Sequence, residues 1–136
     1  MLFRSNGMIE QARTKGLYDR LVVGEFMEFL RSEAEIAAGY HLIVAADVFV
    51  YASNLAPIAD AAARVLAPEG FFAFTVETHA GAGVVLQPTL RYAHGEAHVR
   101  AALADAGLRP ASIDRVSTRT ENGVPVPGLL AISVAK

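Results

Sequence analysis

The stretch over residues 40–50, which reads YHLIVAADVFV, decides the fold of this chain. It is apolar at nearly every position, so both of its faces are expected to be buried, as in a parallel strand with helices on either side. Asp47 interrupts the run near its carboxyl end. A carboxylate among apolar residues costs free energy unless it has a partner, so Asp47 marks this strand end as a candidate site.

Helix and strand signals alternate around this strand. Ser5 and Gly16 are candidate N-cap and C-cap residues of a first helix, and the Asn122-Gly123 pair predicts a hairpin turn near the C-terminus. The alternation predicts an α/β parallel sheet, to which the closing hairpin adds an antiparallel strand. The other predicted elements are a strand over 21–23, a short helix from 26, a helix over 54–66, a strand over 71–76, a loop over 78–90, a helix over 94–106 and strands over 112–118 and 128–135.

Composition limits the function classes. The chain has 136 residues, a formal net charge of −2 and no cysteine, which predicts a single domain over residues 1–136 without disulfides or thiolate metal sites. The near-neutral charge gives no reason to expect nucleic acid, and the apolar runs are too short for a membrane helix of about 20 residues. The lack of cysteine favours a cytoplasmic protein. The apolar share of 53% is high and suggests that some surface has a partner.

Five short segments form an ordered set along the chain. They are SNGMI at residues 5–9 with Ala12-Arg13, Val23-Gly24-Glu25, residues 40–49, LAPEG at residues 66–70 before a Phe-rich strand, and Arg91-Tyr92-Ala93-His94. Together they resemble class I S-adenosylmethionine-dependent methyltransferases, especially the bacterial TPR-repeat-type group of predicted methyltransferases. The resemblance covers nearly the whole chain and implies a three-layer Rossmann-like α/β fold. It also implies that the chain lacks the first strand, Gly-rich loop, helix and second strand of that fold, with Phe3 near the position of the ribose-binding acid.

The resemblance implies a set of cofactor-binding residues. Glu25 corresponds to a group that accepts a hydrogen bond from the adenine amine, although it could instead only cap the following helix. Met8 corresponds to a methionine that packs on adenine, although it could equally be a core residue of an amphipathic helix. Asp47 corresponds to the strand end that lines the methionine part of the cofactor, although it could instead cap a helix. The full candidate set is Ser5, Met8, Glu25, Phe26, Ala46 and Asp47.

Other candidates follow strand ends or lie in the long loop. Asp47, Glu77 and His79 are the candidate catalytic residues, since a carboxylate or imidazole can act as a general base, although a lone histidine is more often structural. The substrate-pocket candidates are Phe49, Tyr51, Tyr92 and His94. His94 and His98 are spaced like two ligands of a zincin site, but the glutamate between them is misplaced for that motif, so no metal site is predicted.

Two functions remain open at this stage. The first is the C-terminal portion of an S-adenosylmethionine-dependent methyltransferase, with an unknown acceptor and weak or absent activity in this isolated chain. The alternative is a non-catalytic α/β interaction module that assembles through an exposed sheet edge. Native proteins rarely leave an apolar edge open, so we expect the outer edge of the 40–50 strand to be covered. The strand over 21–23 or a second copy of the chain, as a homodimer, could supply that cover.

Overall fold

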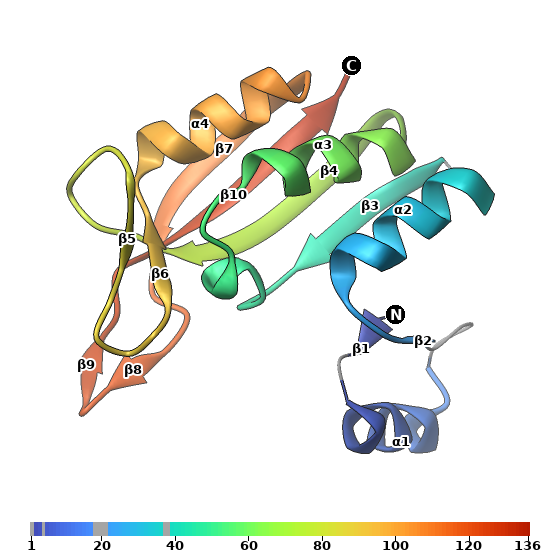
Figure 1. Ribbon diagram of the computed structural model, residues 1–136, viewed down its shortest axis with the longest axis horizontal. Helices are drawn as coiled ribbons and strands as arrows, with labels where there is room; N and C mark the ends of the chain where they lie inside the picture. Colours follow the sequence, from blue (N-terminus) through green and yellow to red (C-terminus); the bar gives the residue numbers. More distant parts are fainter. Residues whose placement is uncertain (1, 4, 18–21, 37–38) are drawn as a thin grey trace.

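The computed structural model describes residues 2–3, 5–17, 22–36 and 39–136, and their order is mostly alternating α and β (Figure 1). Strands β3 and β4 and the C-terminal strands build one mixed sheet, so the predicted Rossmann-like α/β fold is confirmed. The elements are β1 (Leu2–Phe3), α1 (Asn6–Lys15), β2 (Val22–Val23), α2 (Phe26–Ile36), β3 (Tyr40–Ala45), η1 (Phe49–Tyr51), α3 (Ala56–Val65), β4 (Leu66–Glu77), β5 (Val84–Leu86), β6 (Tyr92–His94), α4 (Glu96–Asp105), β7 (Leu108–Val116), β8 (Thr120–Glu121), β9 (Val124–Pro125) and β10 (Gly128–Ala135).

Strand β4 is the centre of the main sheet. It pairs in parallel with β3 on one side and antiparallel with β10 on the other, and β10 also pairs antiparallel with β7. The last strand therefore lies between β4 and β7, as an antiparallel strand joined through the β8–β9 hairpin. Beyond the end of β3, β6 pairs with β4 at Glu77 and Ala93, and β5 pairs antiparallel with β6.

The loop expected over residues 78–90 contains more structure than the sequence indicates. Residues 84–86 form β5 and pair with β6, and His94, expected to begin a helix, instead ends β6. The following helix α4 begins at Glu96, after Gly95 as its N-cap. The glycines and Pro88 in this segment are typical of a loop, and strands of only three residues are too short to give a clear sequence pattern.

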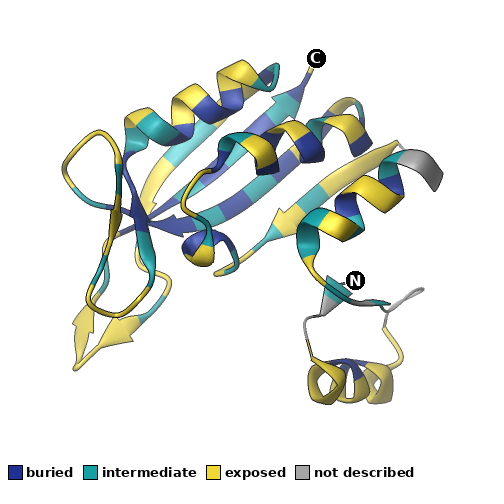
Figure 2. Cartoon of the chain, viewed as in Figure 1, coloured by how far each residue is buried: buried dark blue, intermediate teal, exposed yellow. Residues whose placement is uncertain are grey.

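One layer of helices covers the main sheet. Helices α2, α3 and α4 lie side by side on the same face (Figure 1). On that face the Phe72 and Phe74 rings of β4 lie 4.8 Å apart between centroids, tilted by 36°, and pack against Phe49, while Leu129 and Ala131 of β10 complete the core. Figure 2 shows the buried residues concentrated between this helical layer and the central strands.

Strand β3 is not buried on both faces, contrary to the expectation from its apolar sequence. Leu42 and Val44 are 57% and 65% exposed, because they point to the sheet face that α2, α3 and α4 do not cover. Phe71, the neighbour of Leu42 on β4, is also exposed on that face. Leu42, Val44 and Phe71 are thus exposed apolar side chains on the open face, next to the outer edge of β3.

The N-terminal elements form a separate unit. Strand β2 pairs in parallel with β1, with Leu2 opposite Val22, and helix α1 packs on both strands. Ser5 caps α1 and Gly16 ends it in the left-handed conformation, as predicted from the sequence. Among the described residues, neither β1 nor β2 pairs with β3, so the prediction that the 21–23 strand covers that edge is wrong for Val22 and Val23; residue 21 lies outside the described residues. Figure 1 shows the unit beyond β3, apart from the main sheet.

None of the helices among the described residues is long and apolar enough to cross a membrane. No group of three or more His, Asp or Glu side chains among these residues could hold a metal ion.

Candidate functional site

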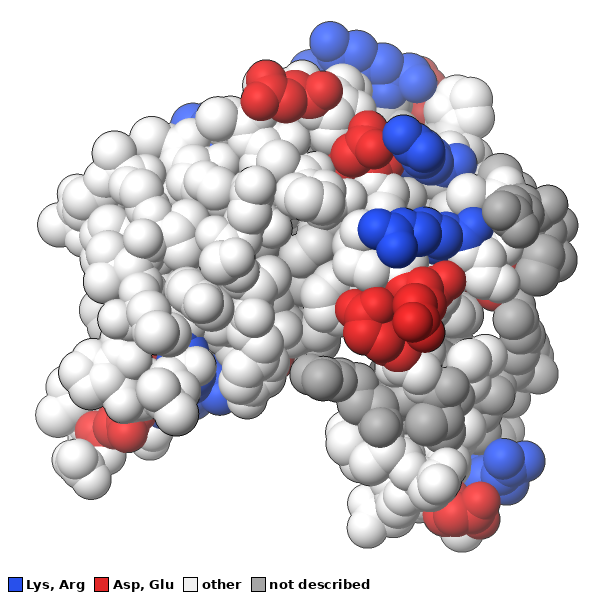
Figure 3. All heavy atoms as spheres, viewed as in Figure 1, with Lys and Arg blue, Asp and Glu red and all other residues white. Residues whose placement is uncertain are grey.

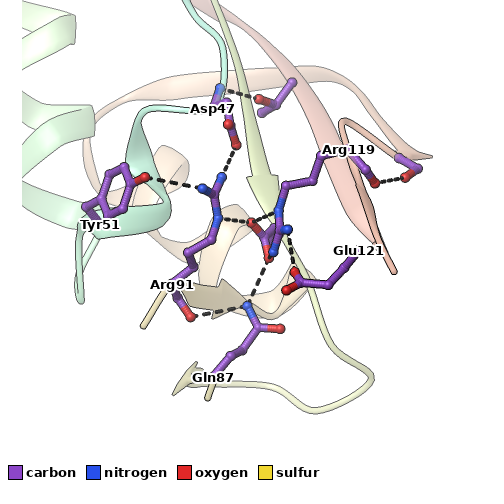
Figure 4. Close-up of polar contacts among 9 residues, drawn as sticks. Asp47, Tyr51, Gln87, Arg91, Arg119 and Glu121 are labelled. Atoms are coloured by element: carbon purple, nitrogen blue, oxygen red, sulfur yellow. Dashed lines mark hydrogen bonds and ion pairs between the residues drawn. The ribbon is translucent and has the colours of Figure 1, made fainter. Parts of the chain in front are cut away.

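Charged side chains meet at the carboxyl ends of β3 and β4, where they form a connected set of ion pairs and hydrogen bonds (Figure 4). Such ends are the usual ligand-binding position of an open α/β sheet. We call this set the Glu77 network. Its members come from β3's exit, η1, the end of β4, the β5–β6 turn and the β8 region: Asp47, Tyr51, Glu77, Gln87, Arg91, Arg119 and Glu121.

Glu77 is the centre of the network. Its side chain is only 1% exposed, and its two carboxylate oxygens accept hydrogen bonds from Gln87 at 3.0 Å, from Arg119 at 3.1 Å twice, and from Arg91. Burial by itself raises the pKa of Glu77, but the hydrogen bonds from Arg119, Arg91 and Gln87 outweigh it and leave the pKa below its ordinary value. Glu77 is therefore a buried, fully partnered carboxylate at neutral pH.

Arg91 connects Glu77 with the end of β3. Its Nε donates to Glu77, its Nη2 donates to Asp47, and its Nη1 donates to the Tyr51 hydroxyl at 3.2 Å. The guanidinium also lies 5.4 Å from the centroid of the Tyr51 ring, within cation–π range. Burial lowers the pKa of Arg91, but its bonds to Glu77 and Asp47 raise the pKa by more than burial lowers it. The pKa is therefore above its ordinary value, and the side chain stays charged.

Asp47 has an unusual backbone conformation. Its φ is +55°, in the left-handed region that Asp tolerates better than most residues, and this turn sends the chain from β3 into η1. Its N–H donates to the Thr75 hydroxyl of β4 at 2.9 Å. The side chain is 46% exposed and paired with Arg91, so Asp47 has the charged partner that the sequence argument required and still faces solvent.

Two of the histidines are committed to the fold. His79 bonds to Gly83 O through Nε2 at 2.7 Å and accepts the Gly81 N–H at Nδ1, so both ring nitrogens are used within its own loop. His94 is completely buried, and its Nε2 bonds to Ala52 O at 2.8 Å while its Nδ1 has no partner. Burial lowers the pKa of His94, and the hydrogen bond to Ala52 offsets this only in part.

The predicted substrate-pocket residues separate into two groups. Phe49 and His94 are buried inside the protein, Phe49 against the Phe72 and Phe74 rings, so neither lines a surface in this structure. The apolar run over residues 40–50 agrees with the burial of Phe49, whereas the sequence around His94 gave no sign that its ring is buried. Tyr51 is exposed and lies beside Arg91, and Tyr92 is half-buried on β6.

The predicted cofactor residues near the N-terminus have local roles. The Ser5 hydroxyl accepts the Met8 N–H at 3.2 Å as an N-cap, and Met8 itself is exposed rather than a core residue. Both Glu25 carboxylate oxygens cap α2 by accepting the Met27 and Glu28 N–H groups at 3.0 Å. Glu25 thus makes the capping contacts of the alternative interpretation, although its side chain stays exposed.

The two remaining predicted cofactor residues are Phe26, at the margin of the core, and Ala46, at the end of β3. The Phe26 ring packs 5.5 Å from the Phe49 ring, at the margin of the core. Ala46 is exposed beside Asp47 at the β3 end. The structure therefore brings Asp47, Tyr51 and Glu77 together through Arg91 at the carboxyl ends of β3 and β4, with Ala46 next to Asp47 in the chain. Ser5 and Met8 lie at the start of α1, in the separate N-terminal unit.

Sequence reasoning did not identify several members of the network. Arg91 appeared only within the Arg-Tyr-Ala-His segment, although it is the one Lys or Arg between residues 65 and 99 and could have been noticed for that reason. Arg119, Gln87 and Glu121 lacked any signal, because their contacts with Glu77 or with one another depend on how β5 and β8 fold back onto β4.

Comparisons with known proteins identify the fold. No protein-family model and no curated protein matches the chain in sequence. Among solved structures, an S-adenosylmethionine-dependent methyltransferase from Methanosarcina mazei aligns at a TM-score of 0.66 and 14% identity, over 98% of this chain and 80% of that one. The N-methyltransferase NodS from Bradyrhizobium japonicum, in complex with S-adenosylhomocysteine, aligns at 0.67 and 18%, over 98% and 64%. The chain has the class I methyltransferase fold.

That fold alone does not fix an activity. The [4+2]-cyclase SpnF aligns at a TM-score of 0.73 and 15% identity, over 98% of this chain and 64% of that one, and its name describes a different reaction. One fold can host unrelated functions, so the activity has to be argued from the site.

Proposed function

We propose that this chain is part of an S-adenosylmethionine-dependent methyltransferase domain of the TPR-repeat-type group, and that residues 1–136 form the C-terminal portion of that domain. The observation that carries this proposal is the exposed carboxylate of Asp47, which stands at the carboxyl end of β3 in a methyltransferase fold. Ligands of open α/β sheets bind at that edge. The acceptor is unassigned, and we expect activity of the isolated chain to be weak.

The described residues fit one end of the cofactor better than the other. S-adenosylmethionine supplies a methyl group on a sulfonium and carries an ammonium on its methionine part. Asp47 and Ala46 would hold that part, because the Asp47 carboxylate is solvent-accessible and attracts a cation. Met8 and Glu25 would lie toward the adenine, with Met8 exposed and Glu25 keeping lone pairs beyond its two capping bonds.

The open edge of β3 supports the view that the domain is completed by another strand. Leu42, Val44 and Phe71 are exposed next to this edge, and among the described residues β3 pairs only with β4. An exposed apolar strand edge readily pairs with another strand. In our proposal that strand comes from a longer polypeptide or from a second copy, and the protein works in the cytoplasm.

The same edge favours the second candidate function, a non-catalytic interaction module that assembles through β3. In that case the Glu77 network would only hold the β5–β6 and β8–β9 hairpins to the sheet. Cofactor binding at Asp47 distinguishes the two functions, since an interaction module has no reason to bind S-adenosylhomocysteine there.

Calorimetric titration with S-adenosylhomocysteine tests the proposal. We expect binding that Asp47→Asn weakens about tenfold or more, because a charged hydrogen bond is worth about 1.5–3 kcal/mol. Asp60→Asn is the matched control, since Asp60 pairs with Arg64 on the exposed side of α3. If Asp47→Asn binds S-adenosylhomocysteine as tightly as Asp60→Asn does, the assignment of Asp47 is wrong. Micromolar binding to the native chain would exclude the interaction module.

A further inference from the structure

We infer that the methyl acceptor presents a carboxylate, which Arg91 and Arg119 bind after their resident counterions are displaced. This inference rests on the proposed methyltransferase function and names its substrate class. It comes from three features of the Glu77 network: the way one buried glutamate anchors two arginines, the exposure of their outer partners, and the lack of a free base among the described residues of the site.

Glu77 fixes both arginines by the same atom. The Nε groups of Arg91 and Arg119 each donate to its Oε2 oxygen, so the two guanidinium groups converge on one buried point. Both terminal nitrogens of Arg91 are then directed outward, toward Asp47 and Tyr51, whereas Arg119 directs only Nη1 outward, toward Glu121, because its Nη2 also donates to Glu77. Glu77 is thus a positioning residue, and the outer guanidinium nitrogens match the planar geometry of a carboxylate.

The outer partners differ from Glu77 in exposure. Asp47 and Glu121 are 46% and 43% exposed, whereas Arg91 and Arg119 are 15% and 23% exposed. Pairs with such exposed carboxylates are screened by water and contribute little free energy. The inner group of one glutamate and two arginines carries a charge of +1, so Asp47 and Glu121 occupy positions that a ligand carboxylate could take. Binding of the cofactor ammonium to Asp47 would free Arg91 for the acceptor.

The described residues of the site offer no uncommitted general base. Glu77 accepts four hydrogen bonds, His79 uses both ring nitrogens in its loop, and His94 is buried. Asp47 and Glu121 are paired with Arg91 and Arg119, and in the proposed complex the displaced Asp47 would hold the cofactor ammonium. An alcohol acceptor must lose a proton during transfer, whereas a carboxylic acid is ionised at neutral pH, since its ordinary pKa is about 4. A carboxylate acceptor therefore suits a site that positions reactants but does not remove a proton.

The transfer step balances without a proton. A lone pair of the acceptor carboxylate oxygen forms the new bond to the methyl carbon of S-adenosylmethionine. The bond between sulfur and that carbon breaks, and its electron pair stays on sulfur. The products are a methyl ester and neutral-sulfur S-adenosylhomocysteine. Arg91 and Arg119 bind and orient the acceptor oxygen, and the chain needs no other co-reactant.

The surface beside the arginines indicates a suitable probe. Residues 78–90 contain no Asp, Glu, Lys or Arg, and Leu86 and Leu90 of the same hairpin are exposed. Figure 3 shows a largely uncharged area on the left of this face, while most charged side chains lie along the top and right of the view, with a small charged patch at the lower left. Octanoate combines a carboxylate with an apolar tail for this surface, and octanamide and octylamine are its neutral and cationic counterparts.

NMR titration of the full chain with these three probes, with and without S-adenosylhomocysteine, tests the inference. We expect octanoate to shift the Arg91 and Gln87 signals and to bind at least about tenfold more tightly than octanamide or octylamine. Arg91→Gln should weaken octanoate binding about tenfold, and Arg100→Gln, which removes an exposed arginine of α4, should not. Glu121→Gln should strengthen binding several-fold, because it removes a competing counterion without touching Glu77.

The gain expected for Glu121→Gln separates a ligand site from a structural network, and it remains measurable if Arg91→Gln does not fold. Equal binding of the three probes, or no gain in Glu121→Gln, overturns the inference. If S-adenosylhomocysteine binds and octanoate does not, only the acceptor class is wrong. If octanoate binds and S-adenosylhomocysteine does not, the carboxylate site stands and the methyltransferase proposal fails.

Discussion

Arg119 makes two hydrogen bonds, each 3.1 Å long, to the buried carboxylate of Glu77, although 42 residues separate them in the sequence. This pair joins the segment before the β8–β9 hairpin to the end of the central strand β4. Arg91 joins the same carboxylate from the β5–β6 turn. One buried acid thus holds two hairpins at the sheet edge where we place the ligand site.

Replacing Glu77 should destabilise the protein. Glu77→Gln keeps the shape of the side chain, but its amide nitrogen would face the N–H donors of Arg91, Arg119 and Gln87. Breaking a buried pair typically costs 3–5 kcal/mol, and because both arginines retain some access to water we expect about 2 kcal/mol here. Urea unfolding of the native chain and of Glu77→Gln measures this loss in the free energy of unfolding. Glu96→Gln, which breaks an exposed pair with Arg100, should change the free energy of unfolding by less than about 0.5 kcal/mol.

Stability should fall as the pH drops below about 6.5. The pKa of His94 is lowered in the folded state by burial, so the unfolded chain binds more protons than the folded one in this range. The contribution of His94 to the free energy of unfolding is therefore fully present above the pKa that this histidine has in the unfolded chain. It is lost as the pH falls below that value. Thermal melts across pH 5–8 would show this slope. It should be reduced in His94→Gln and retained in His41→Gln, which alters an exposed histidine; equal slopes in the two variants would contradict the role of His94.

A side chain at Gly95 should disturb the loop beside His79. A Cβ there would meet the carbonyl oxygen of Gly81 and lie 2.8 Å from the carbonyl of Ala82, both of them backbone groups that cannot easily move. Gly95→Ala should therefore lower the free energy of unfolding by about 2 kcal/mol, the usual cost of overpacking. Gly83→Ala is the control, because nothing lies within 4 Å of its Cβ position. Chemical denaturation of both variants checks this, and an equal effect would disprove the steric argument.

Charge on the open face of β3 should prevent assembly. Val44 is 65% exposed in the single chain, so Val44→Lys should leave the free energy of unfolding within about 0.5 kcal/mol of the native value. If a second copy covers this surface, light scattering should give a dimer for the native chain and a monomer for Val44→Lys. Val124→Lys, on the exposed strand β9, should remain dimeric. A native chain that is monomeric at high concentration would refute pairing between copies.

Local sequence signals were sufficient for much of the fold. The caps Ser5 and Gly16 and the Asn122-Gly123 turn depend on residues close together in the sequence, and each appears where predicted. The local backbone conformation and short-range hydrogen bonds stabilise these caps and this turn. The strand predicted over residues 40–50 begins at Tyr40 but ends at Ala45, and the turn at Asp47 and helix η1 follow it. The order of elements, and from it the α/β class, followed directly.

The environment of each residue was harder to predict. The apolar composition of β3 indicated burial on both faces, but burial depends on which helices lie over the sheet, and α2, α3 and α4 all lie on one side. Phe49 follows a strand end like a site residue, yet η1 turns it into the core. Arg119 reaches Glu77 only because β7 and β10 bring distant segments beside β4, and no local pattern encodes that contact.

The most direct test of the central claim is an NMR titration of the native chain with S-adenosylhomocysteine, which detects even millimolar binding. The account predicts saturable shifts of the backbone amides of Ala46 and Asp47, at the carboxyl end of β3, with smaller changes at Arg91. Amides of Ala46 and Asp47 that stay unchanged throughout the titration, or shifts confined to segments away from this sheet edge, would contradict it.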